Sequence, residues 1–180
     1  MTPQFFMKNQ YSILPEFSNI NGIHIDIARE RDIERIGVLS KKLIEVGLLN
    51  WVWNPQKVAE QIHNQDSLVL VAREEQELIA FVITEFKKNT ANLVLLGVSS
   101  NYQRLGIGSR LVKILEQSAA ALSLTSIKLE VRSENRSART FYKKLGYKEV
   151  RVIRGYYSNH EDAIQMTHRL SYEPATFSSQ

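Results

Sequence analysis

Two periodicities of apolar and polar residues divide most of the chain into short segments. Period-two alternation and short apolar runs predict strands, whereas apolar residues spaced three and four apart predict helices. The expected strands are 23–27, 68–72, 78–86, 93–98, 127–131, 150–153 and 163–170. The expected helices are 29–45, 55–62, 109–122 and 136–145, with Asn54-Pro55 starting the second and Gly146 ending the last. This order predicts an α/β (α+β) fold with a mixed sheet.

The pattern also suggests where the folded part begins and ends. Residues 1–22 contain Pro3, Pro15 and Gly22 with little periodicity, so we interpret them as an N-terminal arm. Residues 23–170 are expected to form a single domain, and 171–180 a polar C-terminal tail. A length of 180 residues is enough for one substantial core.

Composition narrows the function classes only modestly. The chain is 43% hydrophobic and 23% charged, which is ordinary for a globular protein, and it lacks an apolar run long enough to span a membrane. It contains no cysteine, so disulfides and cysteine nucleophiles are excluded, and its 4 histidines lack metal-site spacing. A net charge of +4 without basic runs interleaved with aromatics does not favour nucleic-acid binding. We expect a cytoplasmic location.

The most informative local motif is Gln103-Arg104-Leu105-Gly106-Ile107-Gly108, between an apolar strand and an amphipathic helix. A strand, a glycine turn and a helix N-terminus together direct backbone N–H groups toward a phosphate. A dinucleotide site would need a small residue where Leu111 stands, although Glu130 lies at the right distance for its acidic residue. On spacing alone, an ordinary structural turn is about as plausible.

Further motifs follow this turn along the chain. They are Leu129-Glu130-Val131-Arg132, Asn135, the run 138–147, Arg154-Gly155-Tyr156-Tyr157 and His160-Glu161-Asp162-Ala163-Ile164. Together with the turn they resemble the GCN5-related N-acetyltransferase (GNAT) family over residues 24–170, most strongly over 94–166. The last two motifs are similar to the branch that acetylates the N-terminal alanine of a small-subunit ribosomal protein.

The resemblance implies a single domain with a mixed, mostly antiparallel sheet of six to seven strands and about four helices. It also implies acetyl-coenzyme A as the cosubstrate, without a metal. The residues expected to bind acetyl-coenzyme A are Leu96, Gly97, Val98, Arg104, Leu105, Gly106, Ile107, Gly108, Ser109 and Asn135. Asn135 is equally suited to cap the following helix, and Gly97 suits a bulge or a close ligand approach.

Two residues are expected to carry the chemistry. Some family members place the base before the glycine turn, but residues 91–102 contain neither Asp nor Glu. Glu130 on the next strand is therefore the expected base; its structural alternative is an ion pair with Lys128 or Arg132. Tyr142 matches the family tyrosine that protonates the coenzyme A sulfur, and its structural alternative is an aromatic core residue.

The sequence says less about the acceptor than about the acetyl donor. Tyr156 and Tyr157 are expected to border an acceptor groove, the alternative being an ordinary aromatic turn. We expect direct acetyl transfer to an amine, most plausibly the α-amine of a protein N-terminus, by a monomer or homodimer. A small-molecule amine acetyltransferase and a non-catalytic acyl-coenzyme A binding module stay open as alternatives.

Overall fold

One seven-stranded sheet organises the chain in the computed structural model, which describes residues 22–44, 53–157 and 160–170. The strands are β1 (Ile23–Ile27), β2 (Ser67–Glu74), β3 (Glu77–Lys87), β4 (Thr90–Val98), β5 (Ser126–Arg132), β6 (Lys148–Tyr157) and β7 (Glu161–Arg169). Their order in the sheet is β1-β2-β3-β4-β5-β7-β6. Every neighbouring pair is antiparallel except β4 and β5, which run parallel.

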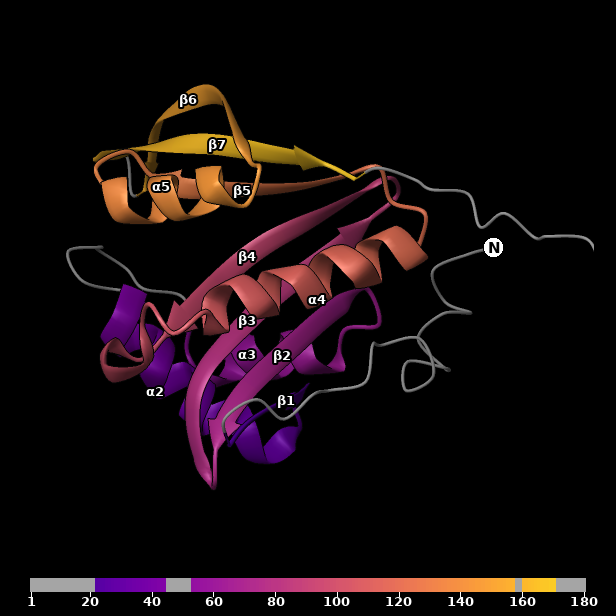
Figure 1. The fold of residues 1–180 in the computed structure, drawn as a ribbon, viewed down its shortest axis with the longest axis vertical. Helices are drawn as coiled ribbons and strands as arrows, with labels where there is room; N and C mark the ends of the chain where they lie inside the picture. Colours follow the sequence, from indigo (N-terminus) through magenta and orange to yellow (C-terminus); the bar gives the residue numbers. More distant parts are fainter. Residues whose placement is uncertain (1–21, 45–52, 158–159, 171–180) are drawn as a thin grey trace, which may run out of the picture.

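Helices cover both faces of the sheet (Figure 1). They are α2 (Ile33–Ile44), α3 (Pro55–His63), α4 (Ile107–Ala121) and α5 (Arg136–Lys144), with 3-10 turns η2 (Glu30–Asp32) and η3 (Ser100–Tyr102). In Figure 1, α4 lies in front of β2–β4, α5 lies in front of β5 and β7, and α2 and α3 lie behind. Among the described residues, the core formed with α2 and α3 includes side chains of β2–β4 and none of β5, β6 or β7.

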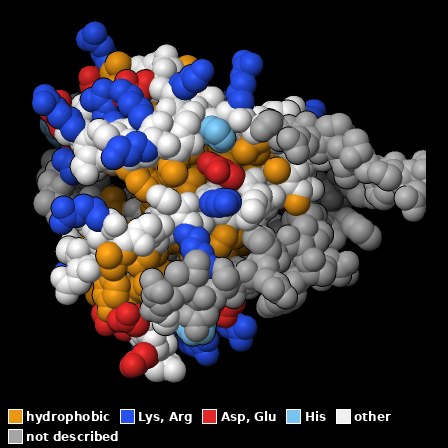
Figure 2. Space-filling view, viewed as in Figure 1, with side chains coloured by type: hydrophobic (Ala, Val, Ile, Leu, Met, Phe, Trp, Pro, Cys, Tyr) orange, Lys and Arg blue, Asp and Glu red, His pale blue; other side chains and the backbone are white. Residues whose placement is uncertain are grey.

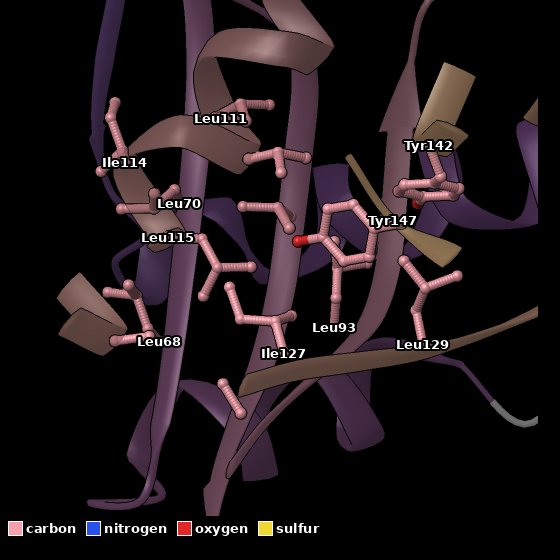
Figure 3. Packing of buried hydrophobic residues seen from close by; sticks show 14 of the residues in the cluster. Leu68, Leu70, Leu93, Leu111, Ile114, Leu115, Ile127, Leu129, Tyr142 and Tyr147 are labelled. Atoms are coloured by element: carbon pink, nitrogen blue, oxygen red, sulfur yellow. The ribbon is translucent and has the colours of Figure 1, made fainter. Parts of the chain in front are cut away.

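The alternation along the strands explains the two cores that result. The larger core joins α4 and α5 to β2–β5 and β7, and the smaller one joins α2 and α3 to β2–β4. Figure 3 shows the larger core, in which Leu111 and Leu115 of α4 pack over the strands and two tyrosines, Tyr142 and Tyr147, lie close together. Burial of these apolar side chains is the main stabilising contribution to the domain.

The structure confirms the predicted fold class and every predicted helix and strand that lies in its described part, with shifted ends. The first predicted helix starts later than residue 29, because the backbone N–H of Arg29 donates to Asp32 and the chain makes a 3-10 turn before α2. The Asn54 side chain caps α3 through the Lys57 amide at 2.9 Å, as Asn54-Pro55 indicates. The expected arm, except for Gly22, and the expected tail lie outside the described residues.

Two of the β-bulges in the ladders lie on β4 and β6. On β4 the register shifts between Leu93 and Leu95, so Val94 is the extra residue. On β6 the register shifts between Glu149 and Arg151, which leaves Val150 60% exposed. Each bulge reverses which alternate side chains face a given side of the sheet.

Candidate active site

The glycine turn lies between β4 and α4. Arg104 and Gly106 both have positive φ, 64° and 82°, and Gly106 is the N-cap of α4. The first amides of a helix have no partner within the helix, and those of residues 104–109 donate no hydrogen bond elsewhere in the described chain. This row of free N–H groups at a helix N-terminus is suited to an anionic group such as a pyrophosphate.

Two side-chain contacts hold the turn in place. The Tyr102 hydroxyl donates to Glu74 at the end of β2 over 2.6 Å, and this bond is the main cause that raises the pKa of Tyr102 to about 12. Gln103 Nε2 donates to the Val98 carbonyl over 3.0 Å. Neither Tyr102 nor Glu74 was expected at the site, because no local pattern links two residues so far apart along the chain.

Positive charge surrounds this end of the molecule. Figure 2 shows Lys and Arg side chains gathered over α5, on the face that also carries α4. Two of the α5 cations, Arg139 and Lys143, pair with Glu149 at 2.8 and 3.1 Å. Arg136 and Lys144 are exposed. The resulting field favours an anionic ligand at the α4 N-terminus.

The sheet opens next to this turn. The parallel pairing of β4 and β5 covers only 90–92 against 126–128, and both strands continue beyond it. Figure 1 shows the two strands diverging from that end. Residues 93–98 of β4 therefore have no ladder partner on β5, and their backbone groups on that side can bind an amide-containing chain.

Gly97 is not the bulge residue of β4, and it allows a close contact between β4 and Phe81. A Cβ at Gly97 would lie 2.6 Å from Cε1 of Phe81, which packs on the α2–α3 side. The bulge itself is at Val94, three positions earlier, so Gly97 serves close packing on the far face of β4. Leu96 and Val98, in contrast, pack toward the core that contains α4.

Tyr142 lies on the α4–α5 side of this opening. Its side chain is only 7% exposed, with ring centroids 5.0 Å from Phe141 and 5.6 Å from Tyr147. The ring is therefore a core residue, as the structural alternative states. Its hydroxyl has no hydrogen-bond partner among the described residues. Unlike the Tyr147 hydroxyl, the Tyr142 hydroxyl is not fully enclosed by protein atoms. Burial, followed by the nearby Tyr157, raises the pKa of Tyr142, so the phenol stays protonated.

Glu130 lies on the opposite face of the sheet. Its neighbours Leu129 and Val131 point into the larger core, so the Glu130 side chain points away from it. Glu130 Oε1 accepts a hydrogen bond of 2.8 Å from Gln165 Nε2 on β7. The ion pair that the structure shows is instead between Arg132 and Glu161, at 2.7 Å. Pairing of Glu130 with Lys128 or Arg132 is thus not the contact observed in the described chain.

Tyr157 lies near both Glu130 and Tyr142. It is the last residue of β6, so Tyr156 and Tyr157 belong to a strand rather than to a turn. The strand continues this far because Gly155 takes a φ of 60° beside a second register shift. The Tyr157 hydroxyl donates to the Glu130 carbonyl oxygen over 3.4 Å, and its proximity to Tyr142 helps to raise the pKa of that phenol. Burial is the main cause that raises the pKa of both Tyr156 and Tyr157.

Asn135 caps α5, since its side chain accepts from the Ala138 amide at 3.0 Å. The carbonyl of Asn135 also accepts from the Arg139 amide. Capping is therefore its observed role, and any contact with a ligand adds to it. Arg104 and Leu105 are exposed, whereas Ile107 is buried beneath the turn.

The geometry defines a class of protein. The site combines free amides at a helix N-terminus with strand backbone that has no ladder partner where β4 and β5 diverge, and with a protonated tyrosine and a carboxylate on opposite faces. These features are suited to transfer of an acyl group from a long phosphorylated carrier. Acetyl-coenzyme A is a carrier of this kind, with a pyrophosphate and an amide-containing arm.

Comparison with known proteins agrees. The family model for the acetyltransferase (GNAT) domain matches residues 40–170, so the chain belongs to this family. An N-alpha-acetyltransferase of Sulfurisphaera tokodaii is 31% identical over 59% of this chain and 72% of its own length. The ribosomal protein bS18 alanine N-acetyltransferase of Salmonella typhimurium is 34% identical over 51% of this chain and 64% of its own.

A solved structure shows the same fold. The ribosomal-protein-S18-alanine N-acetyltransferase from Escherichia coli superposes with a TM-score of 0.73, at 24% identity, over 87% of this chain and 99% of that one. The protein is accordingly an acetyl-coenzyme A-dependent N-acetyltransferase. In the described residues, no group of three or more potential metal ligands gathers, and no helix is both long and apolar enough to cross a membrane.

Proposed function

We propose that the acceptor is the α-amine of a protein N-terminus, such as that of a ribosomal protein. The observation that carries this proposal is a carboxylate, Glu130, beside the opening and on the face away from Tyr142 and the anion-binding turn. An α-amine has a pKa of about 8, so a substantial fraction is neutral near pH 7.5, whereas a lysine at about 10.4 is almost fully charged. A single carboxylate is sufficient help for the former. The names of the two sequence relatives point the same way.

The residues divide the reaction between the two faces. We propose that Glu130 accepts the proton that the amine nitrogen loses as it attacks the thioester carbonyl carbon. As the carbon–sulfur bond breaks, the Tyr142 hydroxyl donates a hydrogen bond to the departing sulfur. The products are an acetylated amine and coenzyme A, whose thiolate takes a proton from water, and Glu130 releases its proton to water. The chain contains no cysteine to form an acetyl-enzyme intermediate, which supports direct transfer.

The raised pKa of Tyr142 shapes its role. Because burial holds that pKa well above the value of about 8.5 of a thiol, complete proton transfer to the thiolate is uphill. A hydrogen bond from a permanently protonated phenol still stabilises the negative charge that develops on sulfur. Tyr142 therefore contributes mainly as a hydrogen-bond donor in the transition state.

The cosubstrate contacts proposed here follow the turn and the opened strand. The pyrophosphate would be bound by the backbone amides of Arg104, Leu105, Gly106, Ile107, Gly108 and Ser109. The pantetheine arm would be bound by backbone groups of Leu96, Gly97 and Val98. Asn135 would contact the same arm in addition to capping α5. Tyr156, which is 49% exposed, and Tyr157 would border the acceptor groove beside Glu130. With a ribosomal protein as the acceptor, we propose that the reaction takes place in the cytoplasm.

A steady-state assay of coenzyme A release tests the acceptor. The wild type is given acetyl-coenzyme A with an alanine-starting peptide, the same peptide with a blocked N-terminus and an internal lysine, a polyamine or an aminoglycoside. Turnover of the free N-terminal peptide alone supports the proposal. Turnover of only the small amines overturns the acceptor, and coenzyme A binding without any turnover identifies a binding module.

A second arm tests the base. Glu130→Gln keeps the size of the side chain but cannot accept the proton, and we expect kcat to fall about 100-fold or more with little change in acetyl-coenzyme A affinity. Lys128→Gln, on the same face and strand, is the matched control and should keep kcat within about two-fold. Equal rates in Glu130→Gln and the wild type would remove Glu130 from the mechanism.

A further inference from the structure

This inference rests on the proposed role of Glu130. We propose that Gln165 and Arg151 form a positioning row that holds the Glu130 carboxylate toward the acceptor amine. The row crosses three neighbouring strands: Arg151 Nε donates to Gln165 Oε1 over 3.0 Å, and Gln165 Nε2 donates to Glu130 Oε1 over 2.8 Å. Both are positioning residues, since neither is placed on the reacting atoms.

The strand register builds this row. Glu130 of β5 is the partner of Gln165 on β7, and Gln165 is in turn the partner of Arg151 on β6. Side chains of directly paired residues lie on the same face and within contact distance. All three side chains therefore lie on the face of β5, β7 and β6 opposite to the larger core.

The bulge on β6 determines which residue completes the row. Along β6, Glu149 pairs with Met166, and the next pair is Arg151 with Gln165, so Val150 is skipped. A regular ladder would place the apolar Val150 opposite Gln165. The bulge brings Arg151 there instead and leaves Val150 exposed. Re-aiming a side chain next to an active site is a common use of a bulge.

Donor and acceptor chemistry then fixes the direction of the row. A guanidinium can only donate, so the Gln165 amide must turn its oxygen toward Arg151. Its NH₂ group consequently faces Glu130, which as a carboxylate can only accept. The reversed amide would place an oxygen against the carboxylate and leave the Arg151 donor unpaired. Arg151 therefore selects the amide orientation that binds Glu130 Oε1 and leaves Oε2 for the amine.

The surroundings of Glu130 show why an uncharged contact matters here. The titratable and charged groups that face it from the described elements are Lys128 and Arg132 of β5, Arg151, Tyr156 and Tyr157 of β6, and Glu161 of β7. Arg132 is already paired with Glu161. Gln165 orients the carboxylate through a neutral amide, so no further ionised group is placed directly beside it.

The test is a kinetic comparison on any amine that the wild type acetylates. Gln165→Leu removes the donor, and we expect kcat to fall about 10-fold while KM for acetyl-coenzyme A stays unchanged, because misplaced groups cost rate rather than cosubstrate binding. Arg151→Ala should lower kcat less, and Arg151→Lys should restore most of the loss by donating to the same oxygen. Thr167→Val, on the same face of β7, is the matched control and should match the wild type.

Two readouts separate positioning from general damage. The double variant Arg151→Ala with Gln165→Leu should be no slower than Gln165→Leu alone, because Arg151 acts only through Gln165. Gln165→Glu places a second carboxylate beside Glu130, so the ascending limb of kcat against pH should move to higher pH.

Each outcome decides the proposal. Any one of three results would overturn the positioning row while leaving the proposed acceptor intact. These are a wild-type kcat in Gln165→Leu, additive losses of kcat in the double variant, and an unchanged pH dependence of kcat in Gln165→Glu. A wild type that acetylates small amines but no N-terminal peptide overturns the acceptor alone. Absence of turnover with every amine overturns both.

Discussion

Removing the Tyr142 hydroxyl isolates the contribution of one hydrogen bond to catalysis. In Tyr142→Phe the ring keeps its contacts with Phe141 and Tyr147, at 5.0 and 5.6 Å. The lost hydroxyl has no partner in the described chain, so its removal leaves no unpaired group behind. We therefore expect the free energy of unfolding to change by less than about 1 kcal/mol.

The catalytic loss follows from the charge on sulfur. A hydrogen bond to a charged partner contributes about 1.5–3 kcal/mol, and each 1.36 kcal/mol of barrier is about tenfold in rate. The kcat of Tyr142→Phe should thus fall roughly 10- to 150-fold. Because burial raises the pKa of Tyr142, the wild-type rate should show no loss from its ionisation up to about pH 10.

The assay is coenzyme A release at saturating concentrations of both substrates, together with thermal unfolding of each variant. Tyr147→Phe is the matched control, since Tyr147 lies beside Tyr142 and loses the same atom, but its hydroxyl is fully enclosed within the core. Its kcat should stay within about two-fold of the wild type. The reasoning is refuted if Tyr142→Phe also stays within that range, or if both variants lose rate equally.

Three further predictions concern the framework around the site. Gly97→Ala should lower the free energy of unfolding by about 1–3 kcal/mol, because the new Cβ would lie 2.6 Å from the Phe81 ring; chemical denaturation measures this. Gly106→Ala meets no atom within 4 Å but must adopt a φ of 82°, so we expect a loss of about 1–2 kcal/mol in stability and weaker coenzyme A binding by calorimetry. Burial raises the pKa of Glu116, partly offset by His168 and Tyr147, so ionisation there opposes folding and stability falls as pH rises above about 4.5. Glu116→Gln should flatten that fall in denaturation curves from pH 4 to 8, and an unchanged slope would refute it.

The elements were predictable because their signals are local. The alternation in 23–27 and the helical spacing in 109–122 each depend on a few neighbouring residues, and core packing then selects the same elements. The same holds for the glycine turn, whose positive φ at Gly106 is what a glycine there indicates.

Other features depend on strands that are distant along the chain, and local patterns carry no information about them. The apolar run 93–98 predicts one regular buried strand, so the bulge at Val94 could not be predicted from it. The predicted strand 150–153 stops short of Tyr157, because Gly155 ordinarily indicates a turn. The bond between Glu130 and Gln165 joins residues on different strands, and only the β5–β7 register reveals it.

The reaction as proposed needs access through the sheet, and the Val94 bulge together with the short β4–β5 pairing meets this need. Beyond the Val94 bulge, Leu96 and Val98 face the α4 side, and β4 has already lost its partner on β5. A continuous ladder would bury the backbone groups of β4 and separate Tyr142 from Glu130 by an intact layer. Because the strands diverge, one thioester can lie between a donor on one face and a base on the other. The cost is several unpaired backbone groups, which bound acetyl-coenzyme A would satisfy, so its binding should stabilise the protein against unfolding.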